Sequence, residues 1–166
     1  MLCDVREDFL DKKLFSELTK QTIENPYFPL YMKYGVARPY SNDGIFFTHS
    51  FLNEDGITSE YFHLLEPIIK LINHKKFDRI QLNLYTKTES NWHYDWHIDS
   101  DVPHKGCILY LNTNDGLTML KNDDDEVVGV RSISNRALFF EPHKEHCSTS
   151  CTDQNFRSII IFNYHE

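Results

Sequence analysis

The sequence predicts a mainly β fold with flanking helices, and three observations lead to this expectation. Aromatic residues make up 14% of the 166 residues, with 12 Phe and 9 Tyr, and such side chains favour pleated, half-buried surfaces. Helical periodicity is confined to the first half of the chain, whereas short extended segments separated by turns follow from about residue 79 onward. Helices first and many evenly spaced strands afterwards are typical of helices packed on a β-sandwich or barrel.

The expected elements follow in order along the chain. An amphipathic helix is expected from about Asp4 to Asn25, with Asp4 as its N-cap. Extended aromatic segments are expected at 30–39 and 44–52, and a second helical stretch at 59–73, which Pro67 kinks or divides. Asn114-Asp115-Gly116 is a strong hairpin-turn signal. Strands are expected at 80–85, 93–99, 107–112, 117–120, 127–133, 137–140 and 158–164.

The composition indicates one globular domain in a reducing compartment. No repeat or linker divides the chain, and 166 residues suffice for one hydrophobic core. The net charge of −8 and the lack of a basic stripe make nucleic acid an unexpected partner. No segment resembles a membrane span or a secretory signal, so we expect a cytoplasmic protein whose four cysteines are free thiols.

The segment 93–99 carries the most unusual chemistry. Alternate side chains of a strand share one face, so His93, Asp95, His97 and Asp99 are expected to project together. Burying such groups costs on the order of 2–7 kcal/mol for each one left without a partner, unless they pair or coordinate. A His-x-Asp pair supplies two ligands of the 2-His-1-carboxylate triad that suits non-haem Fe(II).

A distant histidine and a cation complete the pattern. His143 and His146 both follow the expected strand 137–140, and Arg157 opens the last one. From Asp99 to His146 there are 47 residues, and from His146 to Arg157 there are 11. The overlapping His93-Tyr94-Asp95 is an alternative ligand pair at this point, and His143 is an alternative to His146.

This series, with motifs around it, resembles the Fe(II)/2-oxoglutarate-dependent dioxygenases. The likeness is greatest to small, prolyl-hydroxylase-like members, many from phages and marine microbes, and it covers roughly residues 79–164. It is carried by Asn83-Leu84-Tyr85, His97-Ile98-Asp99, Leu109-Tyr110-Leu111-Asn112, Asn114-Asp115-Gly116, Asn135-Arg136, Glu145-His146, Thr149-Ser150-Cys151-Thr152-Asp153, Arg157 and Phe162-Asn163-Tyr164.

The resemblance implies a fold and a domain plan. The fold would be a double-stranded β-helix (a jelly roll, cupin-like) with the N-terminal helices packed on the sheet. Residues 1–166 would form one oxygenase domain, in which about 1–78 are a supporting region and about 79–166 the double-stranded β-helix core.

The resemblance also implies roles for particular residues. His97, Asp99 and His146 would bind iron and form the catalytic centre. Arg157 would clamp the distal carboxylate of 2-oxoglutarate, where a planar guanidinium fork outperforms a lysine. For cosubstrate binding, further candidates are Tyr85, Asn83 and Tyr110. The order of the two phenols stays open, and His93 and Asp95 would lie at the pocket mouth or pair with each other.

The implied activity is that of a hydroxylase. It would use Fe(II), O₂ and 2-oxoglutarate, release succinate, and hydroxylate a C–H bond of a peptide (prolyl) or small-molecule substrate, in the host cytoplasm if the gene is phage-encoded. Two other classes stay open: a non-catalytic cupin-like metal- or ligand-binding module, and a zinc hydrolase with Glu145 as the nearby general-base candidate. Substrate identity and oligomeric state do not follow from the sequence.

Overall fold

The computed structural model describes residues 2–37, 39, 41 and 43–166. Its helices are α1 (Lys12–Gln21), the short 3-10 helix η1 (Glu60–Leu65) and α2 (Glu66–Ile69). Its strands are β1 (Asp4–Arg6), β2 (Tyr31–Tyr34), β3 (Ile45–Asn53), β4 (Gly56–Ile57), β5 (Lys76–Thr86), β6 (Lys105–Tyr110), β7 (Leu117–Lys121), β8 (Val127–Arg131), β9 (Ala137–Phe140), β10 (His146–Ser148) and β11 (Phe156–His165).

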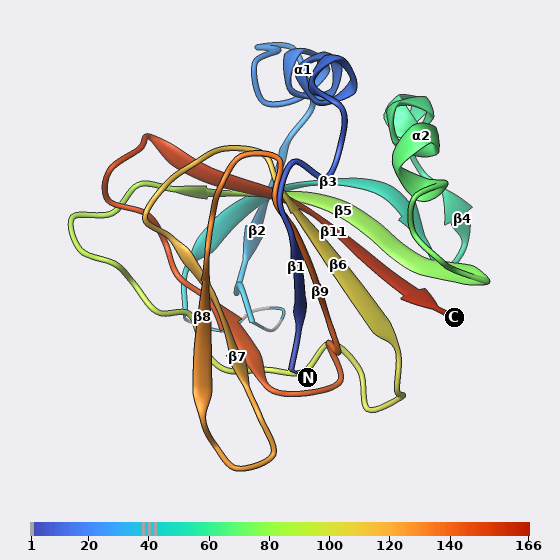
Figure 1. Cartoon of the computed structure of the whole chain (residues 1–166). Coiled ribbons are helices and arrows are strands. Elements are labelled where there is room, and N and C mark those ends of the chain that lie inside the picture. The colour runs from blue at the N-terminus through green and yellow to red at the C-terminus, as the bar shows by residue number, and fades with distance from the viewer. Residues whose placement is uncertain (1, 38, 40, 42) are drawn as a thin grey trace.

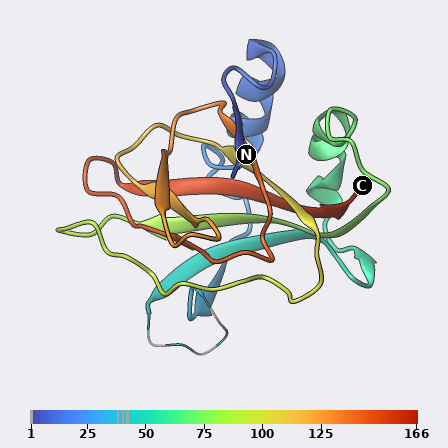
Figure 2. The ribbon, with the colours of Figure 1, turned by 60° about the horizontal axis from the view of Figure 1, so that its bottom comes forward.

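The strands form two antiparallel sheets (Figures 1 and 2). The major sheet has the order β1-β9-β6-β11-β5-β3-β2, with β4 paired to β3 off this path. The minor sheet has the order β10-β7-β8. Figure 1 places α1 and α2 on one side of the major sheet and β7 and β8 on the other.

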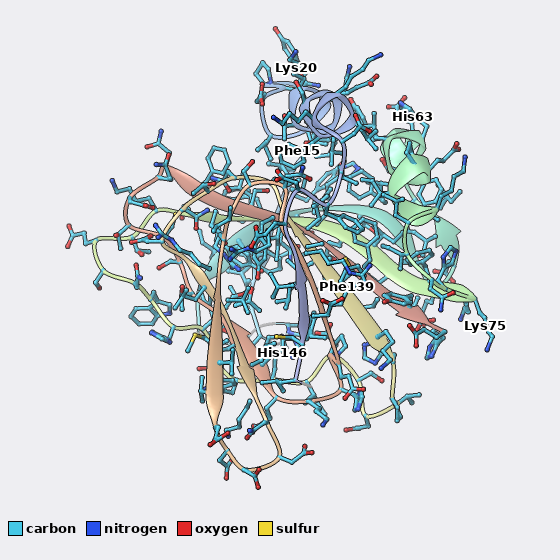
Figure 3. The ribbon with its side chains drawn as sticks, in the orientation of Figure 1. Phe15, Lys20, His63, Lys75, Phe139 and His146 are labelled. Atoms are coloured by element: carbon cyan, nitrogen blue, oxygen red, sulfur yellow. The ribbon has the colours of Figure 1, made fainter. Side chains whose placement is uncertain are left out.

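Alternation along the central strands separates two cores. On β11, Ile160 and Phe162 belong to the core beneath the helices, toward which Phe15 of α1 points (Figure 3). Ile159 and Ile161 belong to a second core between the two sheets. Successive residues of a strand face opposite sides of the sheet. Polar residues on the same face as Ile159 and Ile161 therefore point toward the minor sheet.

The expected mainly β fold with helices packed on the sheet is confirmed, but the first helix is shorter than predicted. Asp11, not Asp4, is its N-cap, and the Asp11 side chain accepts hydrogen bonds from two backbone N–H groups of the first turn. Asp4 lies in β1, where it pairs with Phe139 of β9. Pairing with the edge of the sheet outweighs the intrinsic helix propensity, which is low for Asp4 and Val5.

The other expected elements mostly agree with the structure. The second helical stretch divides as predicted, with Pro67 in the first turn of α2 after η1. In the extended segment expected at 30–39, β2 covers Tyr31–Tyr34, and Arg38 lies outside the described residues. The four cysteines are free. Among the described helices, none has the length and apolarity that crossing a membrane would need.

Candidate metal centre and adjoining cavity

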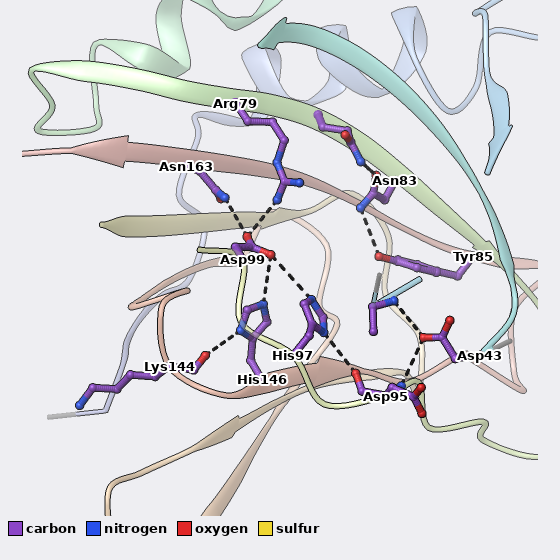
Figure 4. Close-up of polar contacts among 12 residues, drawn as sticks. Asp43, Arg79, Asn83, Tyr85, Asp95, His97, Asp99, Lys144, His146 and Asn163 are labelled. Carbon is purple, nitrogen blue, oxygen red and sulfur yellow. Dashed lines mark hydrogen bonds and ion pairs between the residues drawn. The ribbon is translucent and has the colours of Figure 1, made fainter. Parts of the chain in front are cut away.

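Two histidines and one carboxylate converge between the sheets (Figure 4). One nitrogen each of His97 and His146 and one oxygen of Asp99 lie within 4.8 Å of one another. Asp99 Oδ1 is 3.7 Å from His97 Nε2 and 3.8 Å from His146 Nε2. His146 begins β10, whereas His97 and Asp99 come from the long connection between β5 and β6. Tertiary structure therefore brings the three groups together, since no single helix or strand carries them.

The strand predicted at 93–99 is wrong. The segment touches β10 and its continuation only through isolated bridges, at His93 with Thr149 and at His97 with His146. The N–H of Tyr94 donates to Ser148 O, and that of His97 donates to His146 O. Between these two hydrogen bonds the segment covers three residues, whereas β10 covers only two. This extra residue acts like a β-bulge and changes which side chains face the centre.

The bulge explains why the four polar groups do not share one face. Tyr94 is buried, whereas His93 and Asp95 are exposed. The N–H of Asp95 points away from β10 and donates to the Asp43 carboxylate at 3.4 Å. The overlapping His93-Tyr94-Asp95 pair therefore stands apart from the convergence, and only the carbonyl of Asp95 contacts His97.

Backbone carbonyls select the histidine tautomers. His97 Nδ1 lies 3.2 Å from Asp95 O, and His146 Nδ1 lies 2.9 Å from Lys144 O. A carbonyl oxygen only accepts, so each Nδ1 carries a proton, and Nε2 is the nitrogen that faces Asp99 and has a free lone pair when the ring is neutral. Burial lowers the pKa of His146 to about 4, although the Asp99 charge opposes this shift. His146 is therefore neutral near pH 7, as a metal ligand must be.

Asp99 is ionised for a different reason. Burial alone would raise its pKa, but the Arg79 charge and an Asn163 hydrogen bond hold the pKa of this carboxyl below its usual range, and positive charge on the two histidines, when they are protonated, lowers it further. The donor set is thus two imidazoles and one carboxylate, which fits Fe(II).

The buried histidines predict a pH dependence of stability for the metal-free chain. The unfolded chain protonates its histidines near pH 6.5, whereas burial lowers the pKa of His146 to about 4 and also lowers that of His49. Between these values the unfolded state binds more protons, so stability is full above pH 6.5 and falls as the pH drops toward 4. His146 contributes roughly 3 kcal/mol to this loss.

Urea unfolding at a series of pH values measures this effect. The variant His146→Gln should show a flatter profile between pH 6.5 and 4, with the remaining slope due largely to His49. Equal slopes in the variant and the parent chain would contradict the assigned protonation state of His146.

Arg157 lies beside the centre as a fully buried cation. Its Nε donates to Ser132 at 2.7 Å, its Nη2 to Thr118 at 2.8 Å, and its Nη1 to Ser148 at 3.1 Å and to the Thr149 carbonyl at 3.5 Å. No acidic side chain in the described ranges pairs with it. A buried charge that is hydrogen-bonded but has no counter-ion favours an anionic ligand.

The cosubstrate candidates named from the sequence surround this arginine. The rings of Tyr85 and Tyr110 lie 5.5 and 5.8 Å from the Arg157 guanidinium carbon. Tyr110 donates its hydroxyl proton to Thr118 at 2.8 Å and is buried, whereas Tyr85 lines the cavity. Asn83 faces the same way as Tyr85, as expected, and its amide donates to the Tyr85 hydroxyl at 3.2 Å.

The phenols of Tyr85 and Tyr110 both keep their hydroxyl protons and can donate hydrogen bonds. Burial raises the pKa of Tyr85, and Arg157 offsets only part of that rise. Burial likewise raises the pKa of Tyr110 to about 12. Because Thr118 already accepts from Tyr110 and Arg157, its own hydroxyl proton is free to point elsewhere, and Thr118 lines the cavity.

One cavity of about 430 Å³ is lined both by the three converging groups and by Tyr85, Thr118 and Ser148, which lie next to Arg157. Asp99 is the only acidic residue among its described lining residues. Arg157 is not itself a lining residue and meets the cavity through Thr118 and Ser148. The walls include His97, Asp99, His146, Tyr85, Thr118 and Ser148, with Arg79, Gln81, Asn83 and Thr48, the apolar residues Phe46, Ile108, Ile159 and Ile161, and part of the segment 32–39.

Gly116 leaves the space that the Arg157 side chain fills. A Cβ there would lie 2.6 Å from Arg157 Cδ and 2.9 Å from the Ser150 carbonyl oxygen. Gly116→Ala should displace Arg157 and cost about 1–3 kcal/mol of unfolding free energy, which chemical denaturation measures. Gly129→Ala is the control, because its Cβ would meet only flexible side chains, the nearest atom being Met119 Sδ at 3.2 Å. Equal losses in the two variants would contradict the tight fit.

Sequence reasoning missed two polar residues at the centre. Arg79 and Asn163 both donate to Asp99, at 2.9 and 2.7 Å. Alternation backward along β5 from Tyr85 and Asn83 could have placed Arg79 on the same face. Of the other candidates, His143 contacts His104 instead of the centre, and Glu145 pairs with Lys121 at 2.7 Å outside the cavity lining.

Comparisons with known proteins were made by sequence and by structure. No family model matches the sequence, and no curated protein matches it. Solved structures do match. An oxidoreductase of the 2OG-Fe(II) oxygenase family from Burkholderia pseudomallei gives a TM-score of 0.73 at 7% identity, over 98% of this chain and 84% of that chain. The chain has the fold of the 2OG-Fe(II) oxygenases.

Two further similar structures carry ligands. A prolyl hydroxylase from Trichoplax adhaerens, in complex with a hypoxia-inducible-factor oxygen degradation domain peptide, gives a TM-score of 0.72 at 18% identity, over 98% of this chain and 83% of that chain. The epimerase SnoN, in complex with Fe3+, alpha ketoglutarate and nogalamycin RO, gives 0.67 at 12% identity, over 99% and 78%. Matches at such identities confirm the expected double-stranded β-helix fold.

Proposed function

We propose that this chain is an Fe(II)- and 2-oxoglutarate-dependent oxygenase formed by a single domain. The observation that carries the proposal is that one cavity is lined both by a 2-His-1-carboxylate donor set and by Thr118 and Ser148, whose hydroxyls hold a buried arginine, Arg157, that has no acidic partner among the described residues. The first suits Fe(II) with open positions, and the second suits a carboxylate. A dicarboxylate that reaches from one to the other would satisfy both.

The roles of the residues follow from their free atoms. His97 Nε2, His146 Nε2 and Asp99 Oδ1 would hold the iron. Arg157, with the Thr118 and Ser148 hydroxyls, would hold the distal carboxylate of 2-oxoglutarate. The bound iron supplies the oxidation, in which O₂ and 2-oxoglutarate convert a C–H group to C–OH and yield succinate and CO₂.

The remaining lining residues would prepare the cavity for that chemistry. Phe46, Ile108, Ile159 and Ile161 form an apolar wall that excludes water around the reacting groups. Tyr85, held by Asn83, would give the cosubstrate a fixed phenol donor.

For the substrate we propose a peptide, with a prolyl residue as the hydroxylated unit, or a small molecule. Structures of this fold have been solved with a peptide fragment and with a small molecule, which supports both. The net charge of −8 disfavours a nucleic acid.

The two other classes lack support at the residue level. A zinc hydrolase needs a general base beside the ion, and Glu145 instead pairs with Lys121. A binding module without turnover has no use for a clamp like Arg157 beside the donor set.

Turnover of 2-oxoglutarate tests the proposal. The chain is loaded with Fe(II) without air, 2-oxoglutarate is added, and the weak visible charge-transfer band of an iron–2-oxoglutarate complex is recorded. Air is then admitted and succinate is measured. We expect the band, followed by succinate. Tight Zn²⁺ retention with neither band nor succinate would favour the hydrolase or the binding module.

A further inference from the structure

Arg79 and Asn163 are directly opposed residues on neighbouring strands of the major sheet. They are register partners on β5 and β11. Both side chains reach the same atom: Arg79 Nη2 lies 2.9 Å and Asn163 Nδ2 lies 2.7 Å from Asp99 Oδ2 (Figure 4). One carboxylate oxygen therefore accepts two bonds from the sheet.

The other oxygen of Asp99 has different neighbours. Oδ1 is the atom that lies 3.7 and 3.8 Å from the Nε2 atoms of His97 and His146. The Asp99 side chain is only 10% exposed, so water does little to compensate an oxygen that loses its partners. Turning both oxygens toward the histidines would break both bonds to the sheet.

Nothing else in the described part of the chain accounts for the placement of this pair. Among the described residues, Asp99 is the only side chain to which Arg79 or Asn163 donates. Arg79 Nε and Asn163 Oδ1 are buried and have no partner among the described residues. Burying polar atoms without hydrogen-bond partners costs free energy of folding, so the presence of these two atoms beside the site calls for an explanation.

We propose that Arg79 and Asn163 are positioning residues that hold Asp99 as a one-oxygen metal ligand through Oδ1. A carboxylate that bound through both oxygens would fill one of the positions that three protein ligands leave open. The pair thus keeps that position for the cosubstrate or O₂. The inference rests on the metal site of the proposed function, but not on turnover.

A purely electrostatic role for Arg79 predicts the opposite result. A guanidinium beside the carboxylate repels a divalent cation, so its removal alone should tighten metal binding. If Arg79 positions Asp99, its removal weakens binding instead, because a ligand that has lost its outer hydrogen-bonding partners typically costs roughly 10–100-fold in metal affinity.

Metal titration of the full-length chain separates these cases. Mn²⁺ affinity is measured by calorimetry for Arg79→Gln, Asn163→Ala and Arg79→Lys. We expect roughly 10–100-fold weaker binding for the first two and a smaller loss for the lysine, which keeps a donor. Arg6→Gln is the matched control: its ion pair with Asp4 has a similar length of 2.8 Å, is half-exposed, and lies outside the cavity.

The visible spectrum of the Co²⁺-loaded chain reports the coordination directly. A second bound oxygen of Asp99 would replace a solvent ligand and distort the ligand field, so the bands of Arg79→Gln and Asn163→Ala should differ in position and in intensity per bound ion from those of the parent chain. Affinity for N-oxalylglycine, an unreactive 2-oxoglutarate analogue, should fall in parallel. Circular dichroism checks folding, and the lysine variant serves if the glutamine one does not fold.

The outcomes are distinguishable. No Mn²⁺ binding by the parent chain would remove the metal site and the proposed function with it. Normal binding by the parent chain, with equal or tighter binding by both main variants, overturns the positioning role alone. Weaker binding with an unchanged Co²⁺ spectrum overturns the one-oxygen assignment.

Discussion

Asp99→Ala should abolish the binding of a divalent metal ion, whereas Asp95→Ala should leave it intact. Asp99 Oδ1 faces both histidine Nε2 atoms, so its loss removes one of three ligands from the centre. The expected drop in Fe(II) or Mn²⁺ affinity exceeds the roughly 10–100-fold that loss of an outer partner costs. Calorimetric titration of the metal-free chain measures it.

The control is unusually well matched. Asp95 has the same side chain and also follows a histidine by two residues, but it is exposed and contacts His97 only through its backbone carbonyl. The pair His97→Ala and His93→Ala repeats the comparison. Loss of metal in Asp95→Ala with retention in Asp99→Ala would move the site to the overlapping motif.

Arg157→Gln should leave metal binding intact and remove most of the affinity for 2-oxoglutarate. The guanidinium is buried among the Ser132, Thr118 and Ser148 hydroxyls, and no acidic side chain of the described residues pairs with it. Loss of one partner of a buried, hydrogen-bonded charge pair costs about 2–5 kcal/mol, which is roughly 30-fold or more in affinity. Titration of N-oxalylglycine into the Mn²⁺-loaded chain measures the change.

The same arginine predicts a ligand effect on stability. N-oxalylglycine at 100 times its dissociation constant should raise the unfolding free energy of the Mn²⁺-loaded parent chain by about 2.7 kcal/mol. In Arg157→Gln the same concentration should give little increase. Arg136→Gln is the control, because that arginine pairs with Glu7 at 2.6 Å and, unlike Arg157, its side chain bonds to no residue that lines the cavity. An equal response of all three chains would remove Arg157 from the binding site.

The convergence of His97, Asp99 and His146 could be predicted, but one stated reason for it was wrong. Strand alternation was expected to bring His97 and Asp99 together, and the segment is instead an irregular connection with one extra residue against β10. The spacing in sequence between His146 and Arg157 was the more reliable signal, because β10 and β11 are regular strands that hold their residues in fixed register.

The helix start and the partners of Asp99 could not be predicted for a common physical reason. Asp4 lies in a strand because β9 offers a free edge, and Arg79 meets Asn163 because β5 and β11 are adjacent. Both facts are strand pairings between residues far apart in the sequence, which local propensity does not encode. The sequence indicates the alternation within β5, but it does not indicate that β11 pairs with β5.

A crystal structure of the chain with Mn²⁺ and 2-oxoglutarate tests the central claim most directly. The account predicts one ion bound by His97 Nε2, His146 Nε2 and a single oxygen of Asp99, with the distal carboxylate of 2-oxoglutarate on Arg157 and Thr118. An ion on His93 and Asp95, or a 2-oxoglutarate carboxylate away from Arg157, would contradict it.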